Sequence, residues 1–309
     1  MTYISVNDYL KQRFGCKVYK LAINGGFTCP NRDGTLGDRG CIFCSGYGSG
    51  DFAEDAGLSV TEQIESGKSR VAGKMGKYRS PSPKDESTVY TDGKYIAYFQ
   101  AFTNTYAPVS RLRKLFTEAI DHPEVVVLSI ATRPDCLPEE VLELLSELNE
   151  IKPVWVELGL QTIHEESAKY IRRGYPLSVY EEAVKELNKR GIEVITHVIL
   201  GLPGESREDM LETVRYVGEN KAPSKPAGIK LQLLHVIEGT DLAKDYAAGR
   251  FTCMSMEKYV DLVHDCIELL PDDMVVHRMT GDGAKKTLIA PLWSGDKKRV
   301  LNALNHRLS

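Results

Sequence analysis

The sequence lacks any uninterrupted apolar run of about 18 residues, the length that an ordinary membrane-spanning helix needs. Its first residues contain neither a basic cluster nor an apolar stretch, so we expect no secretory signal. The 7 cysteines among 309 residues are too sparse and too uneven for a disulfide scaffold. Aromatic residues make up only 8% of the chain, and no RNA-binding signature motif is present. We therefore expect a cytoplasmic globular protein whose thiols are free or bind a metal.

Neither acidic nor basic residues dominate overall, because the net charge is only −4. Basic residues are nevertheless concentrated in two segments. Residues 68–84 carry six basic and no acidic side chains, and residues 285–309 carry a local charge of +5, which leaves −15 on the rest of the chain. Two basic segments on an acidic body are compatible with a polyanionic partner, and they are equally typical of solvated surface.

Six apolar runs rich in β-forming residues alternate with helical patterns. These candidate strands span residues 18–23, 95–102, 125–131, 154–160, 194–200 and 229–236. Ser178 and Glu181 form a capping box at the start of one helix, and Ser206 and Asp209 begin another. Strands joined by helical crossovers predict an α/β fold with a parallel sheet, either an open doubly wound sheet or a barrel.

The pattern changes after the sixth run. A helical pattern over residues 255–270 is followed by a short strand at 275–276 and by a basic helix that ends the chain. We therefore expect a sheet domain over residues 1–240 and a small α-rich C-terminal extension over residues 241–309 that packs on it.

Three cysteines, Cys29, Cys41 and Cys44, cluster in the glycine-rich segment 25–46, between the first strand and the first helix that follows it. A structural zinc site needs four protein ligands, and only Cys16 is available nearby as a fourth. An iron–sulfur cluster held by three thiolates keeps one iron open, which is useful only where a substrate or cofactor fills that position. The count favours a reactive iron–sulfur cluster, with zinc and three unrelated buried cysteines as the alternatives.

The segment from Cys29 to Cys44 resembles the cluster loop of radical S-adenosylmethionine (radical SAM) enzymes. Its widened first gap resembles the YhcC-like family and, more distantly, the catalytic subunit of Elongator. Further matching motifs span residues 26–34, 98–105, 157–161, 197–205, 277–282 and 288–293, so the resemblance covers about residues 15–295. It implies a partial (β/α)6 barrel rather than an open sheet.

The resemblance also implies the cofactors. Cys29, Cys41 and Cys44 would hold a 4Fe–4S cluster whose open iron binds S-adenosylmethionine (SAM), and an electron donor such as flavodoxin or ferredoxin would reduce it. Cleavage of SAM would then give a 5′-deoxyadenosyl radical that abstracts hydrogen from the substrate. The family commonly has a Gly-Gly-Glu motif after the second strand, where this chain has Gln100, Thr103 and Asn104 instead. The positions implied for SAM contacts are Phe43, Gln100, Thr103, Asn104, Glu157, Gln161 and Gly201.

The Elongator-like resemblance and the two basic segments indicate a tRNA substrate, with the wobble-uridine side chain as the target. An example from the YhcC-like branch is the conversion of carboxymethylaminomethyl to aminomethyl. Two alternatives remain: a radical SAM enzyme acting on a small molecule, and a non-catalytic, zinc-stabilised RNA-binding module. Arg133, Arg278 and Asp282 lie in matched motifs as candidates for substrate contact. No membrane partner is expected.

Overall fold

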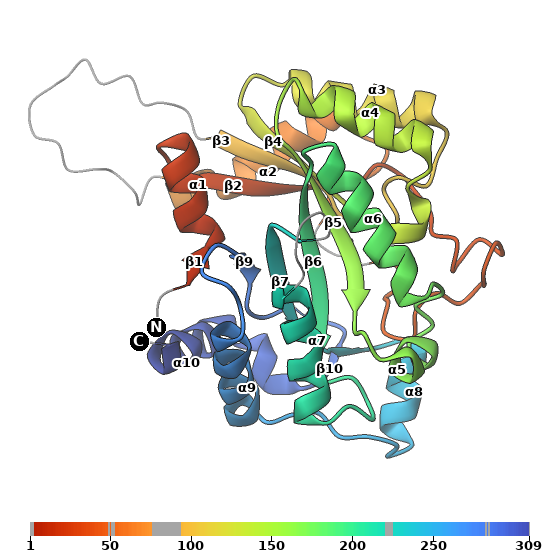
Figure 1. Ribbon diagram of the computed structural model, residues 1–309, viewed down its shortest axis with the longest axis vertical. Helices are drawn as coiled ribbons and strands as arrows, with labels where there is room; N and C mark the ends of the chain where they lie inside the picture. The colour runs from red at the N-terminus through yellow and green to blue at the C-terminus, as the bar shows by residue number, and fades with distance from the viewer. Residues whose placement is uncertain are drawn as a thin grey trace, which may run out of the picture.

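The centre of the computed structural model is one parallel sheet of eight strands, in the order β1-β9-β7-β6-β5-β4-β3-β2. The structure describes residues 3–48, 50, 53–75, 94–219, 225–281, 283 and 285–308. The strands are β1 (Ile4–Ser5), β2 (Val18–Ile23), β3 (Lys94–Phe99), β4 (Val125–Thr132), β5 (Val154–Gln161), β6 (Glu193–Leu200), β7 (Gly228–Leu233) and β9 (Val275–Arg278). Within these described residues β1 and β2 do not pair, so the curled sheet is a half-barrel (Figure 1). The predicted partial barrel is confirmed, and two strands beyond the expected six join it.

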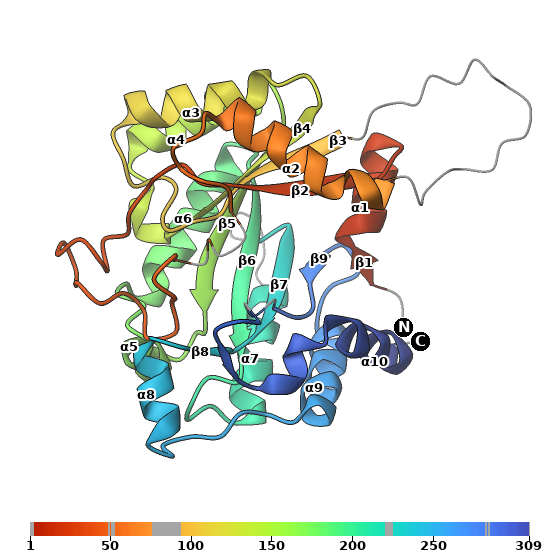
Figure 2. The same cartoon turned by 180° about the vertical axis from the view of Figure 1, so that it is seen from behind.

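Helices connect the strands, and most of them cover the outer face of the sheet (Figure 1). They are α1 (Val6–Phe14), α2 (Val60–Met75), α3 (Val109–Asp121), α4 (Glu139–Asn149), α5 (Glu165–Tyr170), α6 (Leu177–Lys189), α7 (Arg207–Glu219), α8 (Asp241–Ala247), α9 (Met256–Glu268) and α10 (Lys297–Leu308). Helix α3 buries Leu112, Phe116 and Ala119 on one face and packs on β4, while α2 lies along β2 (Figure 2). No helix among the described residues is both long and apolar enough to cross a membrane.

One of the two predicted helix starts is correct, because α7 begins directly after Ser206. The Asp209 N–H donates to Ser206 Oγ over 3.3 Å, and the Ser206 N–H donates to Asp209 Oδ2 over 2.7 Å, just before α7. The other prediction is wrong, because α6 begins at Leu177 and Ser178 lies inside its first turn. A side chain from the preceding helix takes over the cap: Glu165 Oε1 accepts the Leu177 N–H at 3.0 Å.

The C-terminal segment contributes to the sheet itself. Strand β9 pairs in parallel with β7 on one side and with β1 on the other. A separate antiparallel pair joins β8 (Val236–Ile237) to β10 (Leu288–Ala290). Helix α9 packs against α7 and α10, so the segment expected as an extension is joined to the half-barrel by both a strand and a helix.

Candidate functional site

The three clustered cysteines lie on the wall of a cavity of about 600 Å³. Their loop follows β2 directly, at the edge of the sheet where the parallel strands end. The Arg32 N–H donates to the Cys29 carbonyl over 2.8 Å, and the Cys44 N–H donates to the Cys41 carbonyl over 3.1 Å, so tight turns set both ends of the loop. All three thiols are free of disulfides, and they form a soft donor set open to one cavity.

Two of the thiols lie against one another. The hydrogen bond from Cys44 lowers the pKa of Cys41 to about 7, and Asn31, whose Nδ2 lies 3.5 Å from the Cys41 sulfur, adds to this effect. The same hydrogen bond and burial raise the pKa of Cys44. Thiolates are the form that binds metal, so Cys41 is the more readily deprotonated ligand of the pair.

A second segment, residues 171–174, holds the cysteine loop in place. The Ile42 N–H donates to the Ile171 carbonyl over 3.3 Å, and Asn31 Nδ2 donates to the Arg172 carbonyl over 2.7 Å. Gly174 has a φ of +84°, and a Cβ atom there would lie 2.9 Å from Asn31 Oδ1. Only glycine adopts this backbone so close to the loop without strain.

Helix α8 joins this support through one carboxylate. Asp241, the first residue of α8, pairs with Arg39 of the cysteine loop at 2.6 Å and with Arg172 at 2.7 Å. The C-terminal part of the chain therefore contacts the cysteine loop directly.

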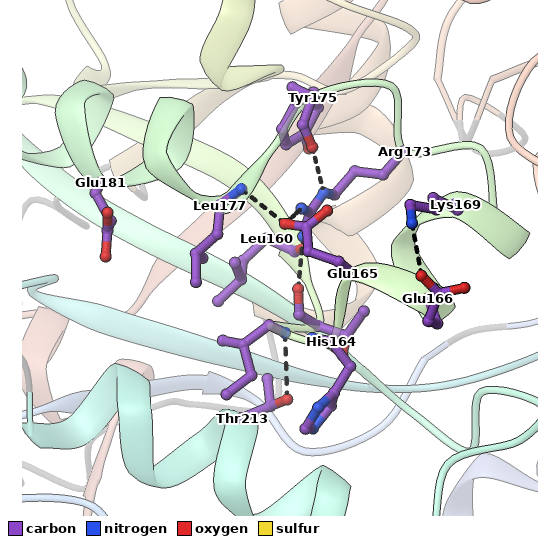
Figure 3. Close-up of polar contacts among 12 residues, drawn as sticks. Leu160, His164, Glu165, Glu166, Lys169, Arg173, Tyr175, Leu177, Glu181 and Thr213 are labelled. Atoms are coloured by element: carbon purple, nitrogen blue, oxygen red, sulfur yellow. Dashed lines mark hydrogen bonds and ion pairs between the residues drawn. The ribbon is translucent and has the colours of Figure 1, made fainter.

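Arg173 fixes the chain where β5 ends (Figure 3). Its side chain is 2% exposed, and its guanidinium donates to the carbonyls of Thr162 (2.6 Å) and Tyr175 (2.9 Å) and to Glu165 Oε1 (3.0 Å). Sequence reasoning missed this residue and Arg172, although two arginines followed by glycine directly after a short helix are an available signal for a charged turn.

Five of the seven residues implied for SAM contacts line the same cavity as the cysteines. They are Phe43, Gln100, Thr103, Glu157 and Gln161. Gln161 has a φ of +67°, and its buried Oε1 has no hydrogen-bond partner among the described residues.

The other two, Asn104 and Gly201, do not line the cavity among the described residues. Asn104 is fully buried and donates from Nδ2 to the Ala131 carbonyl over 2.7 Å. The Gly201 N–H lies 3.0 Å from the Met210 sulfur. Of the three candidates for substrate contact, Arg133 and Arg278 line the cavity, whereas Asp282 lies outside the described residues.

Deeper in the half-barrel, Glu157 is the centre of a buried polar network. Its Oε1 accepts hydrogen bonds from Lys20 Nζ (2.7 Å) and Ser129 Oγ (2.8 Å). Its Oε2 accepts from Lys230 Nζ and lies 2.8 Å from His197 Nε2. Tyr98 and Arg278 line the cavity at the same depth. We call this set the interior layer: Lys20, Tyr98, Ser129, Glu157, His197, Lys230 and Arg278.

The interior layer carries an excess of positive charge. Burial alone would raise the pKa of Glu157, but Lys20 and Lys230 hold it well below its usual value. Burial lowers the pKa of Lys230 well below its usual value, and the charges of Lys20 and Arg278 add to this against the attraction of Glu157. Burial and Lys230 lower the pKa of His197 to about 4, so this imidazole is neutral at pH 7.

Comparison with known proteins identifies the class. A model of the radical SAM superfamily matches residues 29–217, and a model of the radical SAM C-terminal domain matches residues 226–309. The half-barrel and its three-cysteine loop are therefore those of a radical SAM protein, and the chain belongs to this superfamily. Its relatives place it in the YhcC-like family.

Two relatives match almost the whole chain. YtqA from Bacillus subtilis (strain 168) is 46% identical over 99% of this chain and 89% of its own length. YhcC from Escherichia coli (strain K12) is 37% identical over 92% of this chain and 85% of its own length.

More distant matches cover part of the chain or share only the fold. A tRNA uridine(34) acetyltransferase from Dehalococcoides mccartyi (strain CBDB1) is 31% identical over 55% of this chain and 36% of its own length. The structure of Elp3 from the archaeon Methanocaldococcus infernus, with an N-terminal deletion, has a TM-score of 0.65 and covers 94% of this chain and 63% of that chain. Its identity of 19% supports the shared fold alone.

The cofactors follow from the family. Radical SAM proteins use a 4Fe–4S cluster and SAM, and the donor set of this chain fits such a cluster. The thiols of Cys29, Cys41 and Cys44 open onto a cavity that also holds unpaired polar groups such as Gln161 Oε1.

Proposed function

We propose that Cys29, Cys41 and Cys44 are the ligands of the 4Fe–4S cluster, and that this radical SAM enzyme modifies the wobble-uridine side chain of tRNA. The observation that carries the first part is the placement of all three thiols on one cavity wall, beyond the end of β2. When bound, the reduced cluster and SAM supply the 5′-deoxyadenosyl radical that abstracts hydrogen from a substrate.

The residues of the cavity wall position SAM. Gln100 and Thr103, which follow β3, and Gln161, which ends β5, present polar groups at the same edge of the sheet as the cysteines. Phe43 adds an apolar surface next to Cys44, suited to the adenine. Asn104 and Gly201 act next to the wall: Asn104 bonds to the carbonyl of Ala131, which lines the cavity, and Gly201 follows β6 directly.

Glu157 has an active-site role from the interior layer. Its carboxylate lies deep in the cavity with two ammonium partners, so it sets the charge below the reacting groups.

The tRNA assignment is supported by the tRNA uridine(34) acetyltransferase that matches 55% of the chain. It is also supported by exposed basic side chains beside the cavity. Gly283 lines the cavity, and the exposed Lys285 and Lys286 follow it closely in the chain. Helix α10 adds the exposed Lys297, Lys298 and Arg299. Phosphate contacts by these groups would make RNA binding weaken steeply with salt. In the other basic segment, residues 68–84, residues 76–84 lie outside the described part of the chain.

Anaerobic reconstitution tests the cluster ligands. Wild type and Cys16→Ala should bind about four irons per chain and release 5′-deoxyadenosine from SAM with dithionite, whereas Cys44→Ala should lose both properties. Cys16 is a matched control because its thiol does not line the cavity among the described residues. Iron retained in Cys44→Ala, or zinc in place of iron, would refute the assignment.

The substrate is tested by incubating the active enzyme, a flavodoxin or ferredoxin reductant and tRNA, followed by mass spectrometry of the nucleosides. A SAM-dependent change in the wobble uridine is expected. Turnover of SAM that no tRNA stimulates, with nucleosides unchanged, would favour a small-molecule substrate instead.

A further inference from the structure

The deep end of the cavity is lined by three cations that belong to three different strands. Lys20 is on β2, Lys230 on β7 and Arg278 on β9. Among the described residues that line the cavity, the only carboxylate is Glu157. The three cations therefore share one internal counter-charge.

Register places these groups side by side. His197, Lys230 and Arg278 are direct partners on the adjacent parallel strands β6, β7 and β9, so their side chains leave the same face of the sheet. Lys20 reaches the layer from the opposite side: its ammonium and that of Lys230 lie 4.4 Å and 4.7 Å from the centre of the Tyr98 ring. The three cations thus converge on one volume.

Arg278 is the cation left without a carboxylate. Glu157 pairs with Lys20 and Lys230, and no ion pair joins Arg278 to any carboxylate within the described part of the chain. By contrast, two arginines higher on the cavity wall have partners: Arg133 pairs with Asp135 at 2.7 Å and Arg173 with Glu165 at 3.0 Å. Excess charge in a half-buried position is costly unless an anion compensates it.

The backbones of Lys20 and Lys230 lie below the cysteine end of the cavity, and the strand register puts Arg278 level with Lys230. Lys20 stands three residues before the end of β2, and Lys230 stands three residues before the end of β7. At about 3.3 Å per strand residue, both lie about 10 Å below the edge from which the cysteine loop starts. The backbone positions that carry the excess charge therefore lie about three strand residues below the edge from which the cysteine loop starts.

We propose that Lys20, Lys230 and Arg278 form a subsite that binds an oxyanion, a carboxylate or a phosphate, carried by the substrate of this enzyme. The proposal rests on the proposed function in that it assigns the deep cavity to the substrate. The planar guanidinium of Arg278 binds the anion through two parallel hydrogen bonds, and Lys230 adds a point charge beside it. Glu157 keeps both lysines in place while the subsite is empty.

The test titrates the cluster-loaded enzyme with sodium acetate and with inorganic phosphate, against sodium chloride at matched ionic strength. Thermal unfolding and the fluorescence of Trp155, whose ring lies 5.9 Å from the Lys20 ammonium, report binding. Wild type should show a saturable rise in Tm with acetate or phosphate beyond that with chloride. A stronger response to acetate assigns a substrate carboxylate, and a stronger response to phosphate assigns a phosphate.

Two variants at the subsite and one control make the result specific. Arg278→Gln and Lys230→Met should each lower the affinity for the anion about tenfold, and Arg278→Lys should retain part of the affinity that Arg278→Gln loses. Arg113→Gln, an exposed arginine on α3 paired with Glu147, should bind the anion as wild type does. Equal anion binding in wild type and Arg278→Gln, or no response beyond that with chloride, would overturn the subsite.

SAM binding separates the subsite from the cofactor. Equilibrium dialysis of SAM with folded, cluster-loaded Arg278→Gln should give an affinity within about twofold of wild type, because the strand positions that carry the subsite lie below the edge from which the cysteine loop starts. A parallel loss of SAM and acetate binding would mean that the cations hold the carboxylate of SAM, and the proposal would fail. Because no arm uses RNA, failure of the tRNA assignment leaves the result intact.

Discussion

Replacing Glu157 by Gln removes the one carboxylate of the interior layer while keeping the shape of the side chain. The change leaves the buried ammonium of Lys230 without its counter-charge, because the side chain of Lys230 is only 4% exposed. Breaking one side of a buried ion pair typically costs about 3–5 kcal/mol of unfolding free energy.

The structure also sets an upper limit on this cost. The pKa of Lys230 is already far below its usual value, so in Glu157→Gln the lysine can lose its proton instead of remaining charged. Deprotonating a lysine of ordinary pKa about 10.4 costs at most about 4.6 kcal/mol at pH 7 and about 1.9 kcal/mol at pH 9. A base whose pKa is depressed on folding gains stability as the pH rises, and without the attraction of Glu157 the pKa of Lys230 falls further in the variant than in wild type. The variant should therefore gain more than wild type between pH 7 and pH 9, so we expect the Lys230 part of the defect to shrink.

Urea unfolding at both pH values measures the effect in Glu157→Gln, Lys230→Met and the double variant. The double variant should recover at least about 1 kcal/mol of the loss in Glu157→Gln, because it removes the uncompensated charge as well. Glu147→Gln is the control, since that glutamate is exposed and pairs only at the surface, which predicts a much smaller change than in Glu157→Gln. A loss in Glu157→Gln below about 1 kcal/mol at pH 7, or strict additivity in the double variant, would refute this account of the layer.

Three further substitutions test other parts of the site. In wild type the pKa of His197 falls from about 6.5 in the unfolded chain to about 4 in the fold, so lowering the pH from 7 to 5 favours the unfolded state by about 2 kcal/mol. His197→Gln should lack this pH-dependent loss of stability. Parallel pH profiles of unfolding for the two proteins would contradict this. Gly174→Ala should lower the free energy of unfolding by about 1–2 kcal/mol, because its φ is +84° and the new Cβ would contact Asn31. It should also reduce iron binding. The control is the same change at Gly249, where a Cβ has open space, and it should leave the iron content unchanged. Arg173→Met should cost about 3–5 kcal/mol in urea unfolding by leaving buried carbonyls unpaired, and a loss below about 1 kcal/mol would mean that water satisfies them.

The fold was predictable wherever the signal was local. The run 18–23 matches β2 residue for residue, because every residue in it except Lys20 is apolar or aromatic. Strand β1 was not predictable, because Ile4–Ser5 is too short to show a period and exists only through its pairing with β9. The failed cap at Ser178 has the same origin: the group that caps α6 is Glu165, on another helix.

The same distinction divides the site. Cys29, Cys41 and Cys44 were found together because one short loop carries all three, and spacing alone reveals such a set. The need of Glu157 for a partner was also evident, since a carboxylate inside an apolar strand is costly alone. Its partners were available in the sequence as the lysines inside the apolar runs 18–23 and 229–236, yet nothing local links those runs to the strand of Glu157.

The interior layer shows why the roles of its residues cannot be predicted one residue at a time. Seven of the eight strands of the sheet contribute one side chain each to the layer, so the charge of any member depends on members from other strands. The low pKa of Glu157, which burial opposes, requires Lys20 and Lys230, and the low pKa of Lys230 reflects burial first and then the charges of Lys20 and Arg278. This mutual dependence has a measurable consequence. The changes in unfolding free energy caused by two substitutions within the layer should be non-additive, whereas those of one substitution in the layer and one on an outer helix should add.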